Sequence, residues 1–356
     1  VAASFDTTGV NGEFRDIAIE LDDSRITGEL SVFNFDDPSY RFLLRADRID
    51  VDRYLPPRAD AEAADEPDRV LGDMGLASEP LTATVASGTA SIGQLTIGGM
   101  EFSQLSAELA FGGGVASINP VRTELYGGSF SGGLTVDATG ESGVVRLTGN
   151  ADKVAIEPLL TAMLGSSNIR GTGDVSLDLT GQGDTINEAL QSAAGNLSVL
   201  FRDGELEGIN LGYELCEEVN RQRRLPAPAS APDVTAYSVI RASATVAEGI
   251  ASSPDISAST GYLELTGRGG IRLVDQWLDT EFRMRLTGPV RISGCEDLNA
   301  TIEDDPIPVN FTLEGRLPDV DIGLDINQLL QDWARREIQQ RAEQEVRDAI
   351  LDRLLN

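Results

Sequence analysis

Alternating polarity is the feature that most constrains how this chain can fold. Between Tyr40 and Asp47 apolar side chains fill the even positions, and charged side chains fill the odd positions except at Leu43. Successive side chains of a β-strand point to opposite faces, so such a segment has one apolar and one polar face. The same pattern recurs in residues 175–180, 197–202, 282–286 and 309–314. Strands of this kind are typical of antiparallel sheets with one solvated face.

Glycine-rich segments between these strands predict turns. They occur at residues 112–114, 127–128, 132–133, 171–173, 181–183, 203–204 and 269–270. This rhythm is typical of a meander, a sandwich, a barrel or a long open sheet, and the pattern alone does not choose among them. Three short helices are expected to interrupt the strands, over 157–164, from Asp184 to Gly195, and over 211–224.

The charge of the chain excludes several classes of function. It carries 58 acidic and 28 basic residues, a net charge of −30 and no histidine. A nucleic-acid site needs a basic surface, so we expect no nucleic-acid partner. Without histidine, most general-base, triad and zinc chemistry is absent. Lys153 lacks an S-x-x-K context, and Gly171-Thr172-Gly173 precedes neither a lysine nor a helix. We therefore expect neither an enzyme nor a bound cofactor.

Two acidic clusters could suggest metal ligands. They are the run of aspartates at 47, 50 and 52 and the acidic run 303–305. Neither has the residue spacing of a known calcium loop. A solvated acidic face accounts for both, and we expect no metal site.

The two cysteines, Cys216 and Cys295, allow two interpretations. They are either unrelated buried thiols or a disulfide formed in an oxidising compartment. We favour the disulfide.

Three segments differ from the strands. The chain begins at Val1 within a strand-like pattern and without methionine, so we expect further N-terminal residues, including any membrane anchor, to precede it. Residues 56–80 are rich in Pro, Ala, Asp and Glu, which is typical of a flexible acidic linker. Residues 325–356 contain neither Gly nor Pro, and their apolar positions recur at helical spacing. This amphipathic helix either packs over the end of the sheet or docks on a partner.

Several segments, taken in order, resemble elements of the AsmA family. They are D-x-D-x-Y-L-P at Asp50–Pro56, I-G-x-L-x-I-G-G at Ile92–Gly99, L-Y-G-G at Leu125–Gly128, P-L-L with G-x-G-D at Pro158–Asp174, and D-G-x-x-x-G-I at Asp203–Ile209. Each motif consists mostly of residues common in turns and is weak evidence for the family when taken alone. Their order over roughly Tyr40 to Leu317 makes the resemblance, to the C-terminal part of AsmA-like proteins, specific.

The resemblance implies a periplasmic protein of Gram-negative bacteria that is tethered to the inner membrane and acts in outer-membrane biogenesis. Relatives of the TamB type, which are bridge-like lipid transfer proteins, form a long sheet curled into an open groove. We therefore expect a mainly β fold: a long antiparallel repetitive sheet curled into an apolar groove, with short helices and a C-terminal amphipathic helix. Its expected parts are a partial β repeat at 1–55, the linker at 56–80, the groove region at 81–324 and the helix at 325–356.

Such a groove would shield phospholipid acyl chains during transport between membranes. The expected partners are phospholipids, the inner membrane through the preceding anchor, and an outer-membrane or periplasmic protein bound by 325–356. The alternative is a non-catalytic envelope scaffold that assists outer-membrane protein assembly without carrying lipid. The side chains expected to line the groove, each of which could instead be ordinary core, are Tyr40, Phe42, Leu44, Val175, Leu177, Leu179, Leu197, Val199, Phe201, Phe282, Met284, Leu286, Val309, Phe311 and Leu313.

Overall fold

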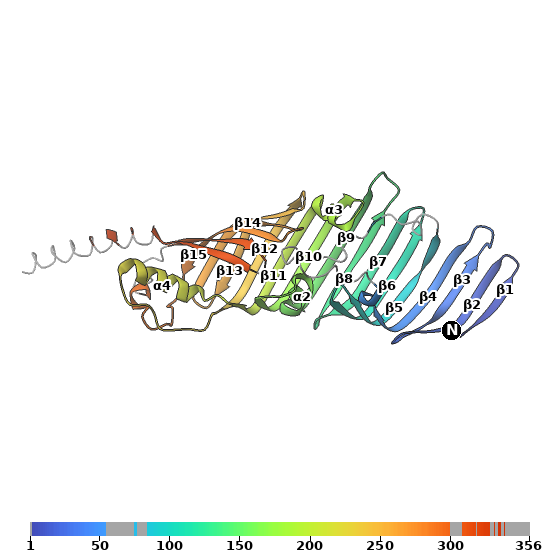
Figure 1. Ribbon diagram of the computed structural model, residues 1–356, viewed down its shortest axis with the longest axis horizontal. Helices are drawn as coiled ribbons and strands as arrows, with labels where there is room; N and C mark the ends of the chain where they lie inside the picture. The colour runs from blue at the N-terminus through green and yellow to red at the C-terminus, as the bar shows by residue number, and fades with distance from the viewer. Residues whose placement is uncertain are drawn as a thin grey trace, which may run out of the picture.

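A computed structural model describes residues 2–54, 75–76, 84–299, 308–317 and 319–327, with single residues at 331, 334, 335 and 338. The described residues form one 17-stranded sheet (Figure 1). Its first strands are β1 (Ala2–Thr8), β2 (Asn11–Leu21), β3 (Ser24–Phe33), β4 (Ser39–Asp50), β5 (Val85–Ile97), β6 (Met100–Gly112), β7 (Val115–Leu125), β8 (Gly128–Asp137) and β9 (Gly143–Ala155). The others are β10 (Ile169–Gly183), β11 (Ala194–Glu207), β12 (Val234–Ala247), β13 (Ile250–Thr260), β14 (Leu263–Arg272), β15 (Trp277–Leu286), β16 (Val309–Arg316) and β17 (Asp319–Asp325).

Strands that follow one another in the sequence are paired throughout the sheet. All of these pairs are antiparallel except β4 with β5, which are parallel. Within the described residues no pairing joins β1 to β17, so the sheet is open. The prediction of a mainly β, repetitive, curled sheet is confirmed, with one parallel pair that the alternating pattern did not indicate.

The parallel pair follows from the long connection after β4. A tight turn can join only antiparallel strands, and parallel strands need a longer crossover. Here β4 ends at Asp50 and β5 begins at Val85. The strands β2, β4, β5, β7, β9, β11, β13, β15 and β17 therefore all end at one edge of the sheet, which we call the motif edge. The remaining strands end at the opposite edge.

Short helices lie at both edges. A 3-10 turn, η1 (Asp52–Tyr54), follows β4, and α2 (Ile156–Leu164), α4 (Leu211–Arg223) and α5 (Glu296–Asn299) also lie at the motif edge. The helix α3 (Ile186–Gln191) lies at the opposite edge. Thr185 caps α3 by accepting a hydrogen bond from the Glu188 amide, and Asn210 caps α4 by accepting one from the Tyr213 amide. The predicted helices at 157–164 and 211–224 are close to these bounds, and the one predicted from Asp184 is shorter than expected.

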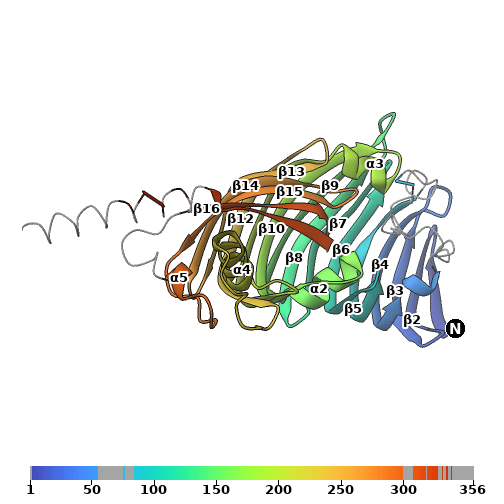
Figure 2. The ribbon, with the colours of Figure 1, turned by 60° about the vertical axis from the view of Figure 1, so that its left-hand side comes forward.

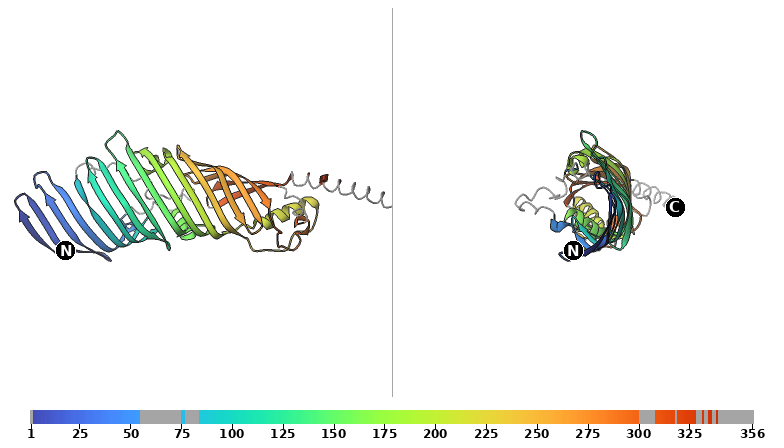
Figure 3. Two further views of the ribbon diagram at one scale, coloured as in Figure 1. Left: turned by 180° about the vertical axis from the view of Figure 1, so that it is seen from behind. Right: turned by 90° about the vertical axis from the view of Figure 1, so that its right-hand side faces the viewer.

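The sheet is curved. Viewed along its length, it forms a bent wall with α2 and α4 on the inner side (Figure 3). The same helices stand in front of the strands when the molecule is turned (Figure 2). We call this side the inner face and the other the outer face.

Most of the predicted glycine turns are wrong. Only the glycines at 112–114 and 127–128 lie at turns between strands, whereas those at 132–133, 171–173, 203–204 and 269–270 lie inside strands, and those at 181–183 end β10. A strand tolerates glycine where it bulges or where a neighbouring side chain needs the space. Asp203, for example, has a φ of 50° within β11, and the β10–β11 pairing shifts register between Arg170 and Thr172.

Two predicted segments lie mainly outside the described residues. Of the linker 56–80, Gly75 and Leu76 are described: Gly75 is bridged to Thr185, and the Leu76 amide donates to the Asp184 carbonyl at 2.9 Å. Of the helix 325–356, Asp325 ends β17 and Ile326 is buried in the core, while nearly all residues beyond 327 lie outside the described ranges. Because β4 pairs with β5, residues before and after the linker belong to one sheet.

Candidate functional site

One face of the sheet is apolar over most of its length. Directly paired residues of neighbouring strands lie on the same face, so the register can be followed strand by strand. From Phe42 the pairing passes through Gly88, Leu109, Ile118, Leu134, Leu147 and Leu179. A second row starts at Leu44 and passes through Ala90, Ala107, Val121, Gly132, Gly149, Leu177 and Leu197. Every member of both rows is apolar or glycine.

The predicted lining residues all lie on this face. Tyr40 is two residues from Phe42 in β4, and Val175 and Val199 are directly paired in the row beside Leu177 and Leu197. Phe201 pairs with Ile240, and the row continues through Ala258, Leu265, Met284 and Val309. Phe282, Leu286, Phe311 and Leu313 follow by the same register. The alternating pattern thus identifies side chains that share one face, and the pairing of the strands brings them together.

The inner face has an open stretch, which comprises its residues on β2 to β11. Phe42, Leu44, Leu177 and Leu197 are half-buried there. Leu147, at the centre of the first row, is 37% exposed. The apolar helix α2 borders this stretch, with Leu159 packed against the inner-face residues Phe130 and Val175. An apolar surface of this length is available to an apolar ligand.

A capped stretch occupies the inner face of β14, β15 and β16. Met284 and Val309 are 1% exposed, and Leu286 and Phe311 are 3% and 4% exposed. They pack in a single core with α4 side chains, which are Leu211, Leu215 and Val219. These predicted lining residues are therefore core residues, because a helix distant from them in the sequence covers them.

A disulfide holds α4 over this core. Cys216 of α4 is joined to Cys295, which lies directly before α5. Beside it, the Asn220 side-chain amide donates to the Gly294 carbonyl at 2.8 Å and to the Pro226 carbonyl at 2.9 Å. Asn299 exchanges two hydrogen bonds with the backbone of Val290. We call α4 and residues 290–299 together the cap.

Phenylalanine rings on the inner face lie over glycines of the neighbouring strand. A Cβ added to Gly88 would lie 2.5 Å from the Phe42 ring, and one added to Gly267 would lie 2.5 Å from the Phe282 ring. The same contact would be 2.9 Å between Gly173 and the Phe201 ring. Each of these pairs is directly opposed in the register, so the missing side chain leaves room for the ring to lie against the sheet. Because the sequence analysis assigns most strand glycines to turns, it misses this arrangement, which depends on the pairing of strands and not on a local spacing.

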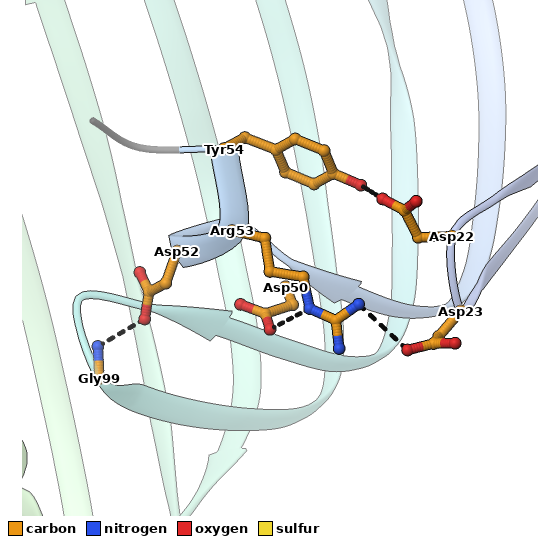
Figure 4. Close-up of polar contacts among 7 residues, drawn as sticks. All are labelled: Asp22, Asp23, Asp50, Asp52, Arg53, Tyr54 and Gly99. Carbon is orange, nitrogen blue, oxygen red and sulfur yellow. Dashed lines mark hydrogen bonds and ion pairs between the residues drawn. The ribbon is translucent and has the colours of Figure 1, made fainter. Parts of the chain in front are cut away.

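The first family motif forms a polar cluster at the motif edge (Figure 4). Asp52 accepts hydrogen bonds from the amides of Gly98 and Gly99, at 2.6 Å and 2.9 Å, and so closes the β5–β6 turn. Arg53 contacts Asp50 at 2.9 Å and Asp23, in the β2–β3 turn, at 3.0 Å. The motif therefore joins three neighbouring connections where the sheet has its parallel pair.

Tyr54 and Asp22 complete this cluster (Figure 4). The Tyr54 hydroxyl donates to the Asp22 carboxylate, and this hydrogen bond raises the pKa of Tyr54. Of the aspartates that resembled calcium ligands, Asp50 is held by Arg53, and Asp47 and Asp52 accept hydrogen bonds from backbone amides. The acidic run 303–305 lies outside the described residues. Across the described residues, no three or more acidic or thiol side chains are arranged to hold a metal ion.

The other motifs also lie at the motif edge. Asp174 accepts hydrogen bonds from the Lys153 amide at 2.9 Å and from Arg202 at 2.5 Å, and these contacts lower its pKa. The buried hydroxyl of Tyr237 donates to the Arg170 carbonyl at 2.6 Å. Burial raises the pKa of Tyr237 to about 12. These contacts fix the strand ends near α2 and α4.

The comparisons with known proteins agree with this architecture. A family model described as the AsmA family matches residues 3–256 of the chain. The chain belongs to the AsmA family. It is also 23% identical, over 348 residues, to Protein AsmA of Escherichia coli (strain K12). That alignment covers 93% of this chain and 56% of the relative, so the chain spans about half the length of the curated protein that it matches. No solved structure matches it.

The AsmA family match runs from β1 into β13 and includes the whole open stretch and α4. The family motifs are the contacts that hold the strand ends at the motif edge. Among the helices that the structure describes, none has the length and apolar character needed to cross a bilayer.

Proposed function

We propose that the open stretch of the inner face binds phospholipid acyl chains, and that the chain is the periplasmic part of an inner-membrane-anchored protein. Membership of the AsmA family supports a role in outer-membrane biogenesis. The finer assignment, lipid transport between the membranes, depends on one observation: the apolar rows continue without a polar interruption from Phe42 to Leu179.

The energetics favour such a ligand. Burial of an acyl chain stabilises it by ~0.8 kcal/mol per CH₂, or on the order of 10 kcal/mol for a chain of ~16 carbons. Neighbouring strands lie about 4.8 Å apart, so the open stretch extends over roughly 45 Å. Rows of similar apolar contacts give an acyl chain many positions of similar energy. Movement along the face therefore needs no large energy input at any one strand.

The outer face suits an aqueous compartment. Its strands carry exposed ion pairs, including Arg146 with Asp178 at 3.0 Å and Arg268 with Glu281 at 2.8 Å. Such pairs contribute little to stability but keep the face solvated. The disulfide is of the kind that persists in oxidising compartments such as the periplasm. The ion pairs suit any aqueous compartment, and the disulfide supports a periplasmic one.

The test is native mass spectrometry of the chain after periplasmic expression, with lipid extraction alongside. We expect bound phospholipid in the unsubstituted chain. In the double variant Leu177→Asp/Leu197→Asp, two carboxylates enter the open stretch, and we expect the lipid to be lost. The matched control, Ser176→Asp/Ser198→Asp, places the same charges on the outer face of the same strand pair. It should retain the lipid.

Circular dichroism checks that both variants fold. A mass free of lipid in the unsubstituted chain, with no uptake of fluorescent phospholipid from vesicles, would contradict the proposal. It would favour the alternative, an envelope scaffold that assists assembly without carrying lipid. Equal loss of lipid in the two double variants would show that charge, not the apolar face, controls binding.

A further inference from the structure

The inner face changes abruptly along the sheet. From β2 to β11 most of its large apolar side chains are half-buried, and Leu147 is 37% exposed. Beyond β13 several inner-face side chains beneath the cap are sealed, and Leu263, Met284 and Val309 are at most 1% exposed. The face is continuous in register across this change, since Phe201 connects through Ile240 and Ala258 to the sealed residues. The exposure of the inner face therefore changes because another element covers it, and not because its side chains become polar.

The covering helix, α4, begins at the point where the open stretch ends. Helix α4 connects β11 to β12, and its first turn is fixed there by Thr235. The Thr235 hydroxyl accepts a hydrogen bond from the Leu211 amide at 3.0 Å and donates to the Ile209 carbonyl at 2.8 Å. From this point α4 leaves the motif edge and lies on the inner side of the sheet (Figure 2).

The cap fills the space that an acyl chain would need. Leu211, Leu215 and Val219 follow one another at four-residue spacing, so they form one apolar stripe of α4. Leu215 and Val219 have no exposed surface, and they share one core with Met284 and Phe311. Close-packed interiors of this kind leave no room for a further chain.

The cap is fixed at its far side as well. Cys216 and Cys295 are 79 residues apart in sequence and covalently joined, and neither has exposed surface. Asn220 adds its two hydrogen bonds to backbone carbonyls next to this disulfide. The cap thus has a fixed root at β11 and β12 and a covalent attachment to the segment before β16.

We propose that the cap is a fixed stop that ends the lipid-binding face at β12. Acyl chains then occupy only the open stretch, and lipid enters and leaves over the edges of the sheet or past β1, not past β17. The inference rests on the proposed function, because it concerns where the same ligand is bound. It also assigns the disulfide the role of holding the stop closed.

The test is photo-crosslinking from matched positions on the inner face. A photoactivatable benzophenone amino acid is placed at Leu147 or Leu177 in the open stretch, or at the half-buried Leu313 beneath the cap, with Ser176 as the outer-face control. Each full-length protein is irradiated with vesicles of phosphatidylethanolamine and phosphatidylglycerol, and adducts are measured by mass spectrometry. We expect adducts at Leu147 and Leu177, and only the background of Ser176 at Leu313.

The outcomes separate the two proposals. Adducts at Leu313 equal to those at Leu147 would overturn the stop while supporting lipid binding. No adduct above the Ser176 background at any position would overturn the proposed function, and the stop with it.

A second variant tests the role of the disulfide. Cys216→Ala/Cys295→Ala removes the covalent attachment but keeps the α4 stripe. We expect the Leu313 adduct to rise several-fold, because α4 can lift more often, while the Leu147 adduct stays unchanged. An unchanged Leu313 adduct would contradict the assignment of the disulfide as the element that holds the stop closed.

Discussion

Single residues decide how far side chains project from the inner face. Phenylalanine is among the largest side chains of the open stretch, and rings that stood upright from the sheet would narrow the space available to a ligand. Glycine on the neighbouring strand removes the Cβ that would hold the ring away from the sheet, as at Gly88 and Gly173. Glycine weakens a strand interior, and an aromatic ring lying over it restores the lost packing. Each pair of phenylalanine and glycine therefore provides a large apolar area while the ring lies flat against the sheet.

Gly88→Ala tests this arrangement. The new Cβ would meet the Phe42 ring at 2.5 Å and its carbonyl oxygen at 2.1 Å, so strand or ring must move. We expect a loss of about 1–3 kcal/mol in the free energy of unfolding, as is typical of overpacked sites. Urea unfolding measures the loss. Gly261→Ala is the control, because nothing lies within 4 Å of the added atom. Equal stability of the two variants would show that Phe42 adapts without cost.

Tyr237 gives the chain a sensitivity to alkaline pH. Its side chain is 4% exposed, and burial raises its pKa to about 12, above the value of about 10 in an unfolded chain. Between these values the unfolded chain releases the phenolic proton while the folded chain keeps it. Stability is therefore unaffected below pH 10 and falls as the pH rises toward 12.

Tyr237→Phe should reduce this alkaline loss. At neutral pH the variant should lose about 1 kcal/mol, because the hydrogen bond to the Arg170 carbonyl is absent. Thermal unfolding followed from pH 8 to pH 12 measures both effects. Tyr40→Phe on the inner face serves as the control and should keep the alkaline loss. If both variants lose stability in parallel with the unsubstituted chain, Tyr237 is not its source.

At the scale of elements, the sequence predicts features that depend on local residues, and it does not predict those that depend on contacts between distant segments. The apolar stripe and the terminal arginines predicted α4 nearly to its ends, because both are properties of one helix. The strand pattern likewise placed Phe42 and Leu177 on one face. It could not show that α4 covers Met284 and Phe311, since nothing in those strands encodes the cover. Leu147 was missed because its role depends on cross-strand partners, which are Leu134 and Leu179.

The motif at the end of β4 joins the parallel pair to the neighbouring turns. Asp52 accepts two backbone hydrogen bonds from the β5–β6 turn, whereas Arg53 makes two ion pairs with a side chain that is 50% exposed. Hydrogen bonds to a charged group contribute more than exposed ion pairs. We therefore expect Asp52→Ala to lose about 2 kcal/mol and Arg53→Ala about 0.5 kcal/mol.

Hydrogen exchange measures this difference locally. In Asp52→Ala, the peptide that contains Gly98 and Gly99 should exchange faster, because both amides lose their acceptor. In Arg53→Ala, exchange of that peptide should stay near that of the unsubstituted chain. Faster exchange in Arg53→Ala than in Asp52→Ala would mean that the ion pairs, not the turn contacts, hold the junction.

The whole molecule is a one-dimensional array. Each strand pairs only with its sequence neighbours, so most contacts are local to two or three strands. The stability of such arrays is close to a sum of units and interfaces, and unfolding can be confined to one part. The open stretch and the capped stretch differ in how they are packed. The open stretch has a solvated outer face and a largely uncovered inner face, while β14 to β16 lie in a closed core with α4 and the disulfide.

Removing the disulfide should therefore act on one end of the molecule. A cross-link over 79 residues restricts the unfolded chain by about 4.5 kcal/mol in the loop-entropy model. In Cys216→Ala/Cys295→Ala we expect faster hydrogen exchange in α4 and in β14 to β16, and unchanged exchange in β5 to β8. Mass spectrometry of peptides from the two regions measures this in a single experiment. Faster exchange along the entire sheet would instead show that the strands unfold as one cooperative unit, and that the cap stabilises strands which it does not touch.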